Sequence, residues 1–353
     1  MQEKIEAYRR FWRGEGPSLI LIPPATMPVY DLEDYPRLFH DPEAMWESEI
    51  RRARAVADWP TDGIPTVRPN LGVVFVPSMG GLSYELKPNQ MPWPGEPIGR
   101  EAIRAARDKD VAQSELMQLA ARFYEIHRES GENRIAAYHA DTQGVFDIAH
   151  LLYGDEVFYE LPDEKEAAWI DELLQISHGL YVKATEHLKR LLGEEAGCMI
   201  HGHGTPQGAF FPNAGARMAE DTPTLLSPQM IEDVILPLIR RAAEPFGGAF
   251  VHYCGHHEAF FDLLCRMECV RAIDLGNPEM YEPRRLLEHC GETGTVLYSC
   301  IRTEQDEAWE HYTRRIAGIV REAGARAILR PAVFPEDRAE AEQMLALWHE
   351  LTG

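Results

Sequence analysis

The chain has 353 residues, and its 57 acidic against 35 basic side chains give a formal net charge of −22. This charge argues against nucleic acid and anionic membranes as partners, because both need a basic footprint. No apolar run approaches the ~20 residues that span a bilayer, and we expect no signal peptide in the charged start MQEKIEAYRRFWRGEG. The six cysteines lack secreted-type spacing, which predicts a cytoplasmic protein. We expect its substrate to be a small molecule.

Short apolar runs alternate with long amphipathic stretches, and no linker or internal repeat divides the chain. We expect strands, in chain order, at residues 18–22, 72–76, 135–139, 198–201, 249–254, 271–275, 295–301 and 327–329. We expect helices at residues 164–192, 228–243, 258–267, 283–288, 307–323 and 337–351. Alternation of this kind over ~250 residues is typical of a parallel sheet with crossover helices.

About eight strands favour a closed barrel over an open doubly wound sheet, and no GxGxxG motif follows the first strand. The predicted fold class is therefore α/β, a (β/α)8 TIM barrel that forms a single domain over residues 1–353. Residues 1–57 are expected to hold an N-terminal helical extension and the first barrel elements. One helix start is well marked, because Ser227 is a good cap and Pro228 suits the first helical turn.

In such a barrel the functional side chains gather where the strands end. The polar residues at the expected strand ends are His139, Asp141, His201, His203, His252, Cys254, Asp274 and Cys300. A carboxylate in a largely closed mouth can serve as an acid or a base. Asp274 is also a candidate partner that orients His252. Asp221 precedes a helix and is interpreted as a capping or loop residue.

The segment AFVHYC places His252 and Cys254 on the same side of an extended strand, because residues i and i+2 share a face. An imidazole and a thiolate together suit zinc, and a catalytic zinc site needs about three protein ligands. Cys300 is the best-placed third ligand, and His203 is the next candidate. The structural alternative is a satisfied histidine beside an ordinary buried cysteine.

The run LLSPQMIEDVILPLIRRAAEPFGGAFVHYCGHHEAFFDLLCRMECVRAIDL resembles the uroporphyrinogen decarboxylase superfamily, which carries a similar SP…LP…H-x-C-G pattern. The segments RPNLGVVFVPSMGG and ADTQGVFDIAHLLYGDEVFYELPDE are similar as well, so the resemblance covers residues 58–353. It implies a barrel with two known activities, cofactor-free decarboxylation of a tetrapyrrole and methyl transfer between a corrinoid protein and a thiol. In the methyltransferases the H-x-C pair binds zinc, which implies this role for His252 and Cys254.

The chain departs from the family pattern at two places. The region LILIPPATMPVYDLEDYP has no arginine cluster to receive the carboxylates of a tetrapyrrole. In AILRPAVFPEDRAEAEQM, Ala332 lies where the methyltransferases have their third ligand, a cysteine, so Cys300 or His203 would replace it. The alternative to such a replacement is a site that binds no zinc, although the H-x-C pair itself is present.

The leading hypothesis is a zinc-dependent methyltransferase that moves a methyl group between a corrinoid or related methylated substrate and a thiol. One alternative is a cofactor-free carboxy-lyase, and another is a corrinoid- or tetrapyrrole-binding protein without turnover. A corrinoid protein and a second copy of the chain are the candidate partners. The predicted catalytic residues are Asp141, His203 and Asp274. The predicted substrate contacts are Asn70, His139, His201, Tyr253 and His256, and the predicted metal ligands are His252, Cys254 and Cys300.

Overall fold

The structure is a computed structural model that describes residues 1–28 and 32–353. Residues 29–31, part of the segment without an arginine cluster, lie outside the described residues. No helix in the described ranges is both long enough and apolar enough to cross a membrane.

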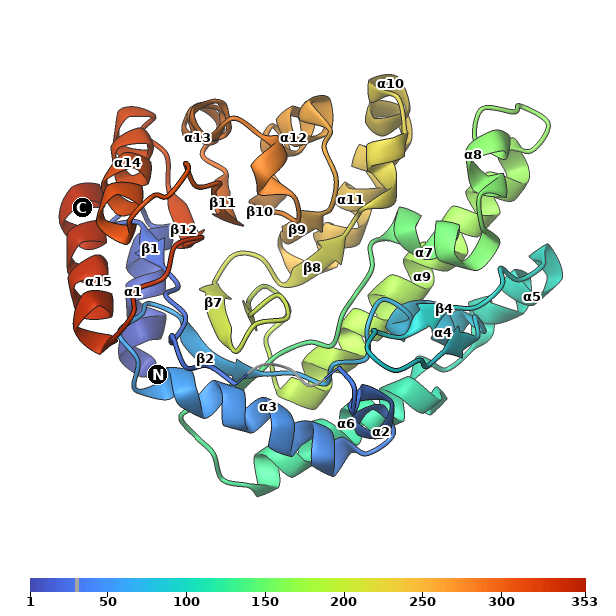
Figure 1. Cartoon of the computed structure of the whole chain (residues 1–353). Coiled ribbons are helices and arrows are strands. Elements are labelled where there is room, and N and C mark those ends of the chain that lie inside the picture. The colour runs from blue at the N-terminus through green and yellow to red at the C-terminus, as the bar shows by residue number, and fades with distance from the viewer. Residues whose placement is uncertain (29–31) are drawn as a thin grey trace.

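A six-stranded parallel sheet carries the C-terminal half of the chain. Its order is β1 (Leu19–Ile20), β12 (Ala327–Arg330), β11 (Val296–Cys300), β10 (Val270–Leu275), β9 (Ala249–Tyr253) and β8 (Ala216–Ala219). These strands curve in an arc, and helices lie along its outer side (Figure 1). The outer helices are α11 (Leu236–Ala243), α12 (Glu258–Cys265), α13 (Pro283–Thr293), α14 (Trp309–Glu322) and α15 (Arg338–Thr352).

A second sheet has the order β5 (Ala136–Ala137), β2 (Ile64–Val67), β7 (Gln207–Phe211) and β6 (Met199–His201). Strands β2 and β5 are parallel, whereas β7 runs antiparallel to both β2 and β6. A bridge between Gln143 and Ala219 connects the segment after β5 to β8. Near β1, the backbone N–H of Asp62 donates to Ile20 O at 3.0 Å. The described ladders thus form an α/β fold with a parallel sheet, and full closure of a (β/α)8 barrel stays a prediction.

The remaining elements lie mostly in the N-terminal half. They are α1 (Gln2–Trp12), α2 (Tyr35–Phe39), α3 (Pro42–Ala57), α4 (Phe75–Gly80), β3 (Tyr84–Glu85), β4 (Trp93–Pro94), α5 (Arg100–Ala105), α6 (Glu115–Glu129), α7 (Val145–Tyr153), α8 (Glu156–Glu160), α9 (Ala167–Leu192) and α10 (Pro228–Met230). The expected helical content of residues 1–57 is confirmed, as is the cap at Ser227, whose Oγ accepts from Met230 N at 3.3 Å. The assignment of the whole chain to one domain stays a prediction.

The strand predicted at residues 72–76 is wrong. Helix α4 begins at Phe75, and the strand of this region is β2, earlier in the chain. The run GVVFV is apolar throughout and α4 is buried along most of its length. A short continuous apolar run does not distinguish a buried strand from a buried helix, because neither shows a polar face.

Alternation along the strands separates two apolar layers. The inward side chains, among them Phe250, Ala272, Tyr298 and Ile328, form one buried cluster with residues of the β6–β7 hairpin and α1. The next residues along these strands belong to the cluster that packs under the outer helices. Helix α1 lies against the hairpin, where Trp12 Nε1 donates to Phe210 O at 2.8 Å. The inner cluster therefore forms an apolar floor beneath the polar residues at the strand ends.

We expect Gly215→Ala to destabilise the fold, because a Cβ at this position would overlap the carbonyl oxygen of Ala196 and press on Phe246 O. Overpacking against backbone costs about 1–3 kcal/mol or more in the free energy of unfolding. Gly179→Ala is the matched control, since this α9 residue has no neighbour that a Cβ would meet, and it should stabilise by about 0.5–1 kcal/mol. Chemical denaturation measures both, and equal stability of the two variants would contradict the packing of this loop.

Candidate active site

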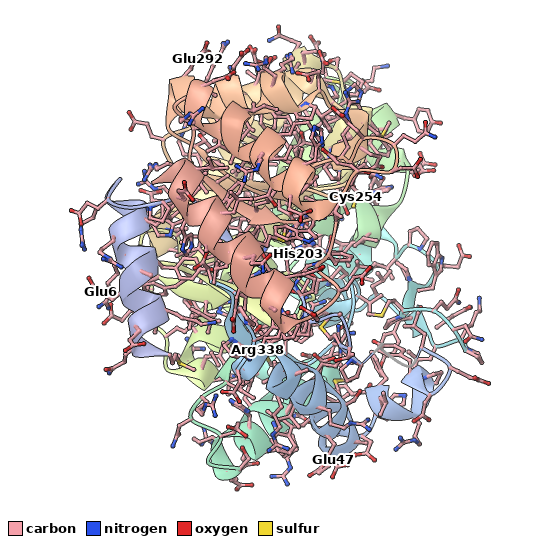
Figure 2. All side chains as sticks on the ribbon, turned by 60° about the vertical axis from the view of Figure 1, so that its left-hand side comes forward. Glu6, Glu47, His203, Cys254, Glu292 and Arg338 are labelled. Atoms are coloured by element: carbon pink, nitrogen blue, oxygen red, sulfur yellow. The ribbon has the colours of Figure 1, made fainter. Side chains whose placement is uncertain are left out.

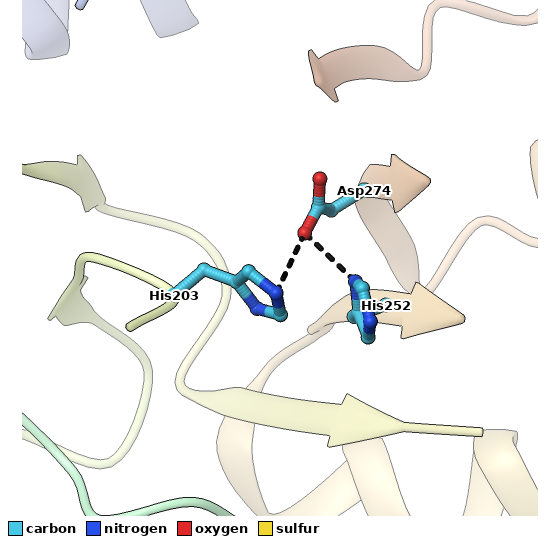
Figure 3. A group of neighbouring side chains, drawn as sticks. All are labelled: His203, His252 and Asp274. Atoms are coloured by element: carbon cyan, nitrogen blue, oxygen red, sulfur yellow. Dashed lines mark hydrogen bonds and ion pairs between the residues drawn. The ribbon is translucent and has the colours of Figure 1, made fainter. Parts of the chain in front are cut away.

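His252 and Asp274 are direct neighbours on the parallel strands β9 and β10. His252 is 6% exposed and Asp274 is fully buried. His252 Nδ1 lies 2.8 Å from Asp274 Oδ2, as Figure 3 shows. Because a carboxylate only accepts, Nδ1 of the neutral ring carries the proton, and Nε2 presents its lone pair to a ligand.

Asp274 also contacts the side chains of Arg330 and His203. Its other oxygen pairs with the guanidinium of Arg330, and His203 Nε2 lies 3.3 Å from Oδ2 (Figure 3). His203 has a left-handed backbone with φ 43°, and its ring centroid lies 4.0 Å from that of His252. Burial, together with the positive charge of Arg217, holds the pKa of His203 well below its usual value. The structure thus brings two predicted catalytic residues, His203 and Asp274, into one buried network.

Cys254 lies beside the free nitrogen of His252. Its Sγ is 3.5 Å from His252 Nε2, so both face the same side as the strand spacing predicts. Cys254 is exposed, whereas the side chain of His203 is largely covered. Both residues are labelled in Figure 2. Partial burial of the thiol and the nearby carboxylates of Asp221 and Asp274 raise the pKa of Cys254 to about 12. A Cβ at Gly276 would overlap this sulfur, so the missing side chain on β10 leaves room for the thiol.

The structure adds Asp221 to this group. Ala219 pairs with His252 across β8 and β9, so Asp221 lies beside Cys254 two residues further on. Asp221 Oδ1 accepts from Cys254 N at 2.6 Å and lies 3.9 Å from His252 Nε2. Ligand atoms of these three residues all lie within 4.8 Å of one another. The prediction that Asp221 caps the following helical turn is wrong, since its side chain makes no bond to that turn. The alternative prediction of a loop residue agrees with its bond to Cys254 N.

Cys300 ends β11, and strand β10 lies between it and the strand of Cys254. Among the described residues, Cys300 belongs to no group of three metal-ligating side chains. It lines a separate cavity of about 170 Å³ together with Arg330 and Phe334. The structure does not bring Cys300 to the His252–Cys254 pair, and its part as a third ligand stays a prediction.

A cavity of about 740 Å³ opens beside Asp221. Two predicted site residues, Asn70 and Asp141, line it. Its other walls include Arg52, Arg68, Val73, Met91, Trp93, Asp147 and Leu151. Burial raises the pKa of Asp141, but the charges of Arg217 and Arg68 outweigh it and leave the pKa below its usual value. Asp141 therefore faces the cavity as an ionised carboxylate, which can stabilise a cation but holds no proton to donate.

Four predicted substrate contacts lie elsewhere. His139 is fully buried with Nε2 3.0 Å from Glu194 Oε2, and His201 Nδ1 accepts from His203 N at 3.0 Å. The other two are Tyr253, whose hydroxyl lies 3.0 Å from that of Tyr281, and His256, whose ring packs on Tyr281. None of the four lines the cavity of about 740 Å³, and their substrate contacts stay predictions.

Three arginines also surround the site and were absent from the sequence-based candidates. They are Arg68 after β2, Arg217 within β8 and Arg330 at the end of β12. Arg217 pairs with Asp141, and its Nη2 lies 3.2 Å from His203 Nδ1. An arginine inside a short apolar strand is the signal that could have identified two of them, because a buried guanidinium needs a partner.

No protein-family model and no curated protein match the chain. Among solved structures, a methyltransferase from Methanosarcina mazei is similar with a TM-score of 0.65. The two chains are 14% identical, and the alignment covers 97% of this chain and 96% of the other. At this identity the likeness concerns the fold, and membership of the uroporphyrinogen decarboxylase superfamily stays a prediction. The chain therefore shares the fold of a methyltransferase over nearly its full length.

Proposed function

We propose that the chain is a zinc-dependent methyltransferase that moves a methyl group from a corrinoid, or a related methylated substrate, to a thiol. The observation that carries the proposal is the separation of 3.5 Å between His252 Nε2 and Cys254 Sγ. In a tetrahedral site with Zn–N of about 2.0–2.1 Å and Zn–S of about 2.3 Å, two such ligand atoms stand about 3.5 Å apart. The fold shared with a methyltransferase supports the same reading.

The surroundings of the pair also fit zinc. His252 donates its other ring N–H to a carboxylate, an arrangement that fixes the ring of most metal-ligating histidines. Gly276 leaves room for the sulfur on the neighbouring strand. The residues present therefore fit a zinc ion held by His252 and Cys254.

When bound, zinc would supply a positive charge that lowers the pKa of an acceptor thiol and keeps it as the nucleophilic thiolate. His252 and Cys254 would hold the ion, and Asp274 accepts from Nδ1 of His252, which leaves Nε2 as the nitrogen that would bind it. The cavity beside Asp221 would hold the small substrate against this site. Apolar walls such as Met91 and Leu151 keep water from the thiolate.

The size of the cavity indicates which reactant it holds. About 740 Å³ is within the range of pockets for drug-sized molecules. A small thiol or methylated compound fits there, whereas a whole corrinoid is larger than such ligands. We therefore place the small reactant in the cavity and a corrinoid, carried by a partner protein, at its opening.

A carboxy-lyase is the second candidate, because Asp141 faces the cavity as an ionised carboxylate. Such a group can stabilise a cation that develops during decarboxylation. Arg217 and Arg68 neutralise much of its field, however, since both lie against it. The geometry of the donor atoms at His252 and Cys254 favours methyl transfer.

Metal analysis and methyl transfer test the proposal together. The native chain, purified without added metal and then given zinc, should hold about one ion and transfer methyl from methylcobalamin to a thiol. Cys254→Ser and His252→Ala should lose both properties, because each removes a ligand. Cys198→Ser is the control for a cysteine outside the site. A native chain that binds no zinc contradicts the proposal and favours the lyase; zinc and chromophore binding without transfer favours a binding protein.

We expect Asp274→Asn to weaken zinc affinity about 10–100-fold, because loss of the carboxylate partner of a ligating histidine has this effect. An asparagine amide can donate to Nδ1 and move the ring proton to Nε2, which then binds no metal. Competition with a chromophoric chelator measures the affinity. Asp262→Asn, which breaks an ion pair with Arg285 away from the site, is the control. Unchanged affinity in Asp274→Asn would show that the Nε2 lone pair does not depend on this contact.

Gly276→Ala should lower zinc affinity without removing a ligand, since the new methyl group would displace the sulfur of Cys254. We expect a loss of about tenfold, which corresponds to about 1.4 kcal/mol. Gly318→Ala within α14 meets no neighbour and serves as the matched control. Equal zinc affinity in the two variants, both folded by circular dichroism, would mean that Cys254 does not hold the ion in this position.

A further inference from the structure

We infer that Asp221 is the third protein ligand of the metal site, so that the ion is held by Asp221, His252 and Cys254. This inference rests on the proposed zinc at His252 and Cys254. It replaces both third ligands that the sequence suggested with a carboxylate from β8, on the other side of β9.

The β8–β9 ladder brings Asp221 to the metal side of His252. The backbone N–H of Glu220 donates to His252 O at 2.8 Å, and that of Cys254 donates to Asp221 Oδ1 at 2.6 Å. The two chain segments therefore run side by side through both ligating residues of β9. Asp221 Oδ1 lies 3.9 Å from the nitrogen of His252 that carries the lone pair.

Hydrogen bonds hold the backbone of Asp221, and Cys254 N holds its side chain at Oδ1. Asp147 accepts from Asp221 N at 3.0 Å and from Thr222 N at 2.8 Å, and Thr224 Oγ1 donates to Asp221 O at 2.7 Å. The side chain is 40% exposed and lines the large cavity. Carboxylate and imidazole ligands on one tetrahedral zinc stand about 3.4 Å apart. A small side-chain rotation closes the difference from 3.9 Å without moving the backbone.

His203 is excluded as the third ligand because it lies on the Nδ1 side of His252, whereas the proposed metal lies on the Nε2 side. Its Nε2 lies 3.3 Å from Asp274, and its Nδ1 lies 3.2 Å from Arg217 Nη2. The 2.8 Å separation of His252 Nδ1 and Asp274 Oδ2 is a hydrogen-bond length, shorter than the distance between two zinc ligands. Asp274 also pairs with Arg330. The group His203–His252–Asp274 is therefore a hydrogen-bonded support, and the metal side is that of Nε2.

The other exposed group of potential ligands is also occupied. The two carboxylate oxygens of Glu307 accept from Nε and Nη2 of Arg315, each at 2.7 Å. Because Arg315 holds Glu307, its neighbours Glu304 and His311 lack a third ligand. Within the described residues, Asp221, His252 and Cys254 thus form the three-residue group in which no arginine pairs with a ligand.

The carboxylate determines what the site can bind. One thiolate and one carboxylate bring a formal charge of about −2, which neutralises Zn²⁺. An oxygen ligand donates less electron density than a second thiolate, so the ion stays more electrophilic. Asp221 lines the cavity, so a reactant held there would lie next to one of the three proposed ligands. The site therefore fits a small thiol that binds the ion directly through sulfur.

Metal titrations of the full chain test this inference, with Zn²⁺ and Co²⁺ as probes. Asp221→Asn should bind zinc about 100-fold more weakly or worse, since even indirect partners are worth 10–100-fold. Asp221→Cys should regain tight binding, and its Co²⁺ complex should show about twice the thiolate charge-transfer absorption of the native chain. Glu304→Gln is the matched control for an exposed acidic residue away from the site, and its affinity should be native.

The outcomes separate this inference from the proposed function. Native affinity in Asp221→Asn, with metal still lost in Cys254→Ser, overturns the ligand assignment and leaves the zinc methyltransferase intact. A native chain that binds neither metal overturns both. Loss of binding in Asp221→Asn with rescue in Asp221→Cys supports the assignment, because a variant that merely misfolds is not rescued by a new ligand.

Discussion

The site depends on one buried charge, the carboxylate of Asp274. A fully buried carboxylate is costly unless its partners are complete, and here three side chains meet it. Arg330 comes from β12, His252 from β9 and His203 from the loop after β6. One residue on β10 therefore ties together strands on both of its sides and the hairpin inside the curve. The contact of Asp274 with His252 Nδ1 also sets the tautomer of the His252 ring. The same carboxylate therefore contributes to the stability of the fold and to the orientation of a candidate metal ligand.

The register of β8, β9 and β10 places the candidate ligands next to this buried network. The first row across the strand ends holds Ala219, His252 and Asp274, which pair directly on β8, β9 and β10. Two residues further on, the same faces carry Asp221, Cys254 and Gly276. The first row is buried and holds the His252 ring, whereas the second row carries the candidate ligands Asp221 and Cys254, of which Asp221 lines the cavity. Gly276 matters for the position of Cys254, because a side chain on Gly276 would overlap the sulfur.

Sequence patterns predicted the parts that depend on local periodicity. Strands β9 to β12 and their helices were located within a few residues, and the shared face of His252 and Cys254 follows from a period of two. Strand β8 was missed because its four residues, ARMA, include the charged Arg217. Without β8 no register linked Asp221 to Cys254, so this contact could not be predicted. The roles of Arg217 and Arg330 were missed for a related reason, since ion pairs between distant strands leave no local pattern.

The end of β12 explains why a third ligand from the last strand is unsuitable here. Arg330 occupies that end and pairs with Asp274, so the end of β12 carries a positive charge. A cation close to zinc disfavours binding, whereas a carboxylate on the opposite flank favours it. Moving the third ligand to β8 keeps the guanidinium bound to Asp274, behind His252, and keeps the negative ligands on the cavity side. Charge placement and ligand placement thus lead to the same open face, the one that Asp221 shares with the substrate cavity.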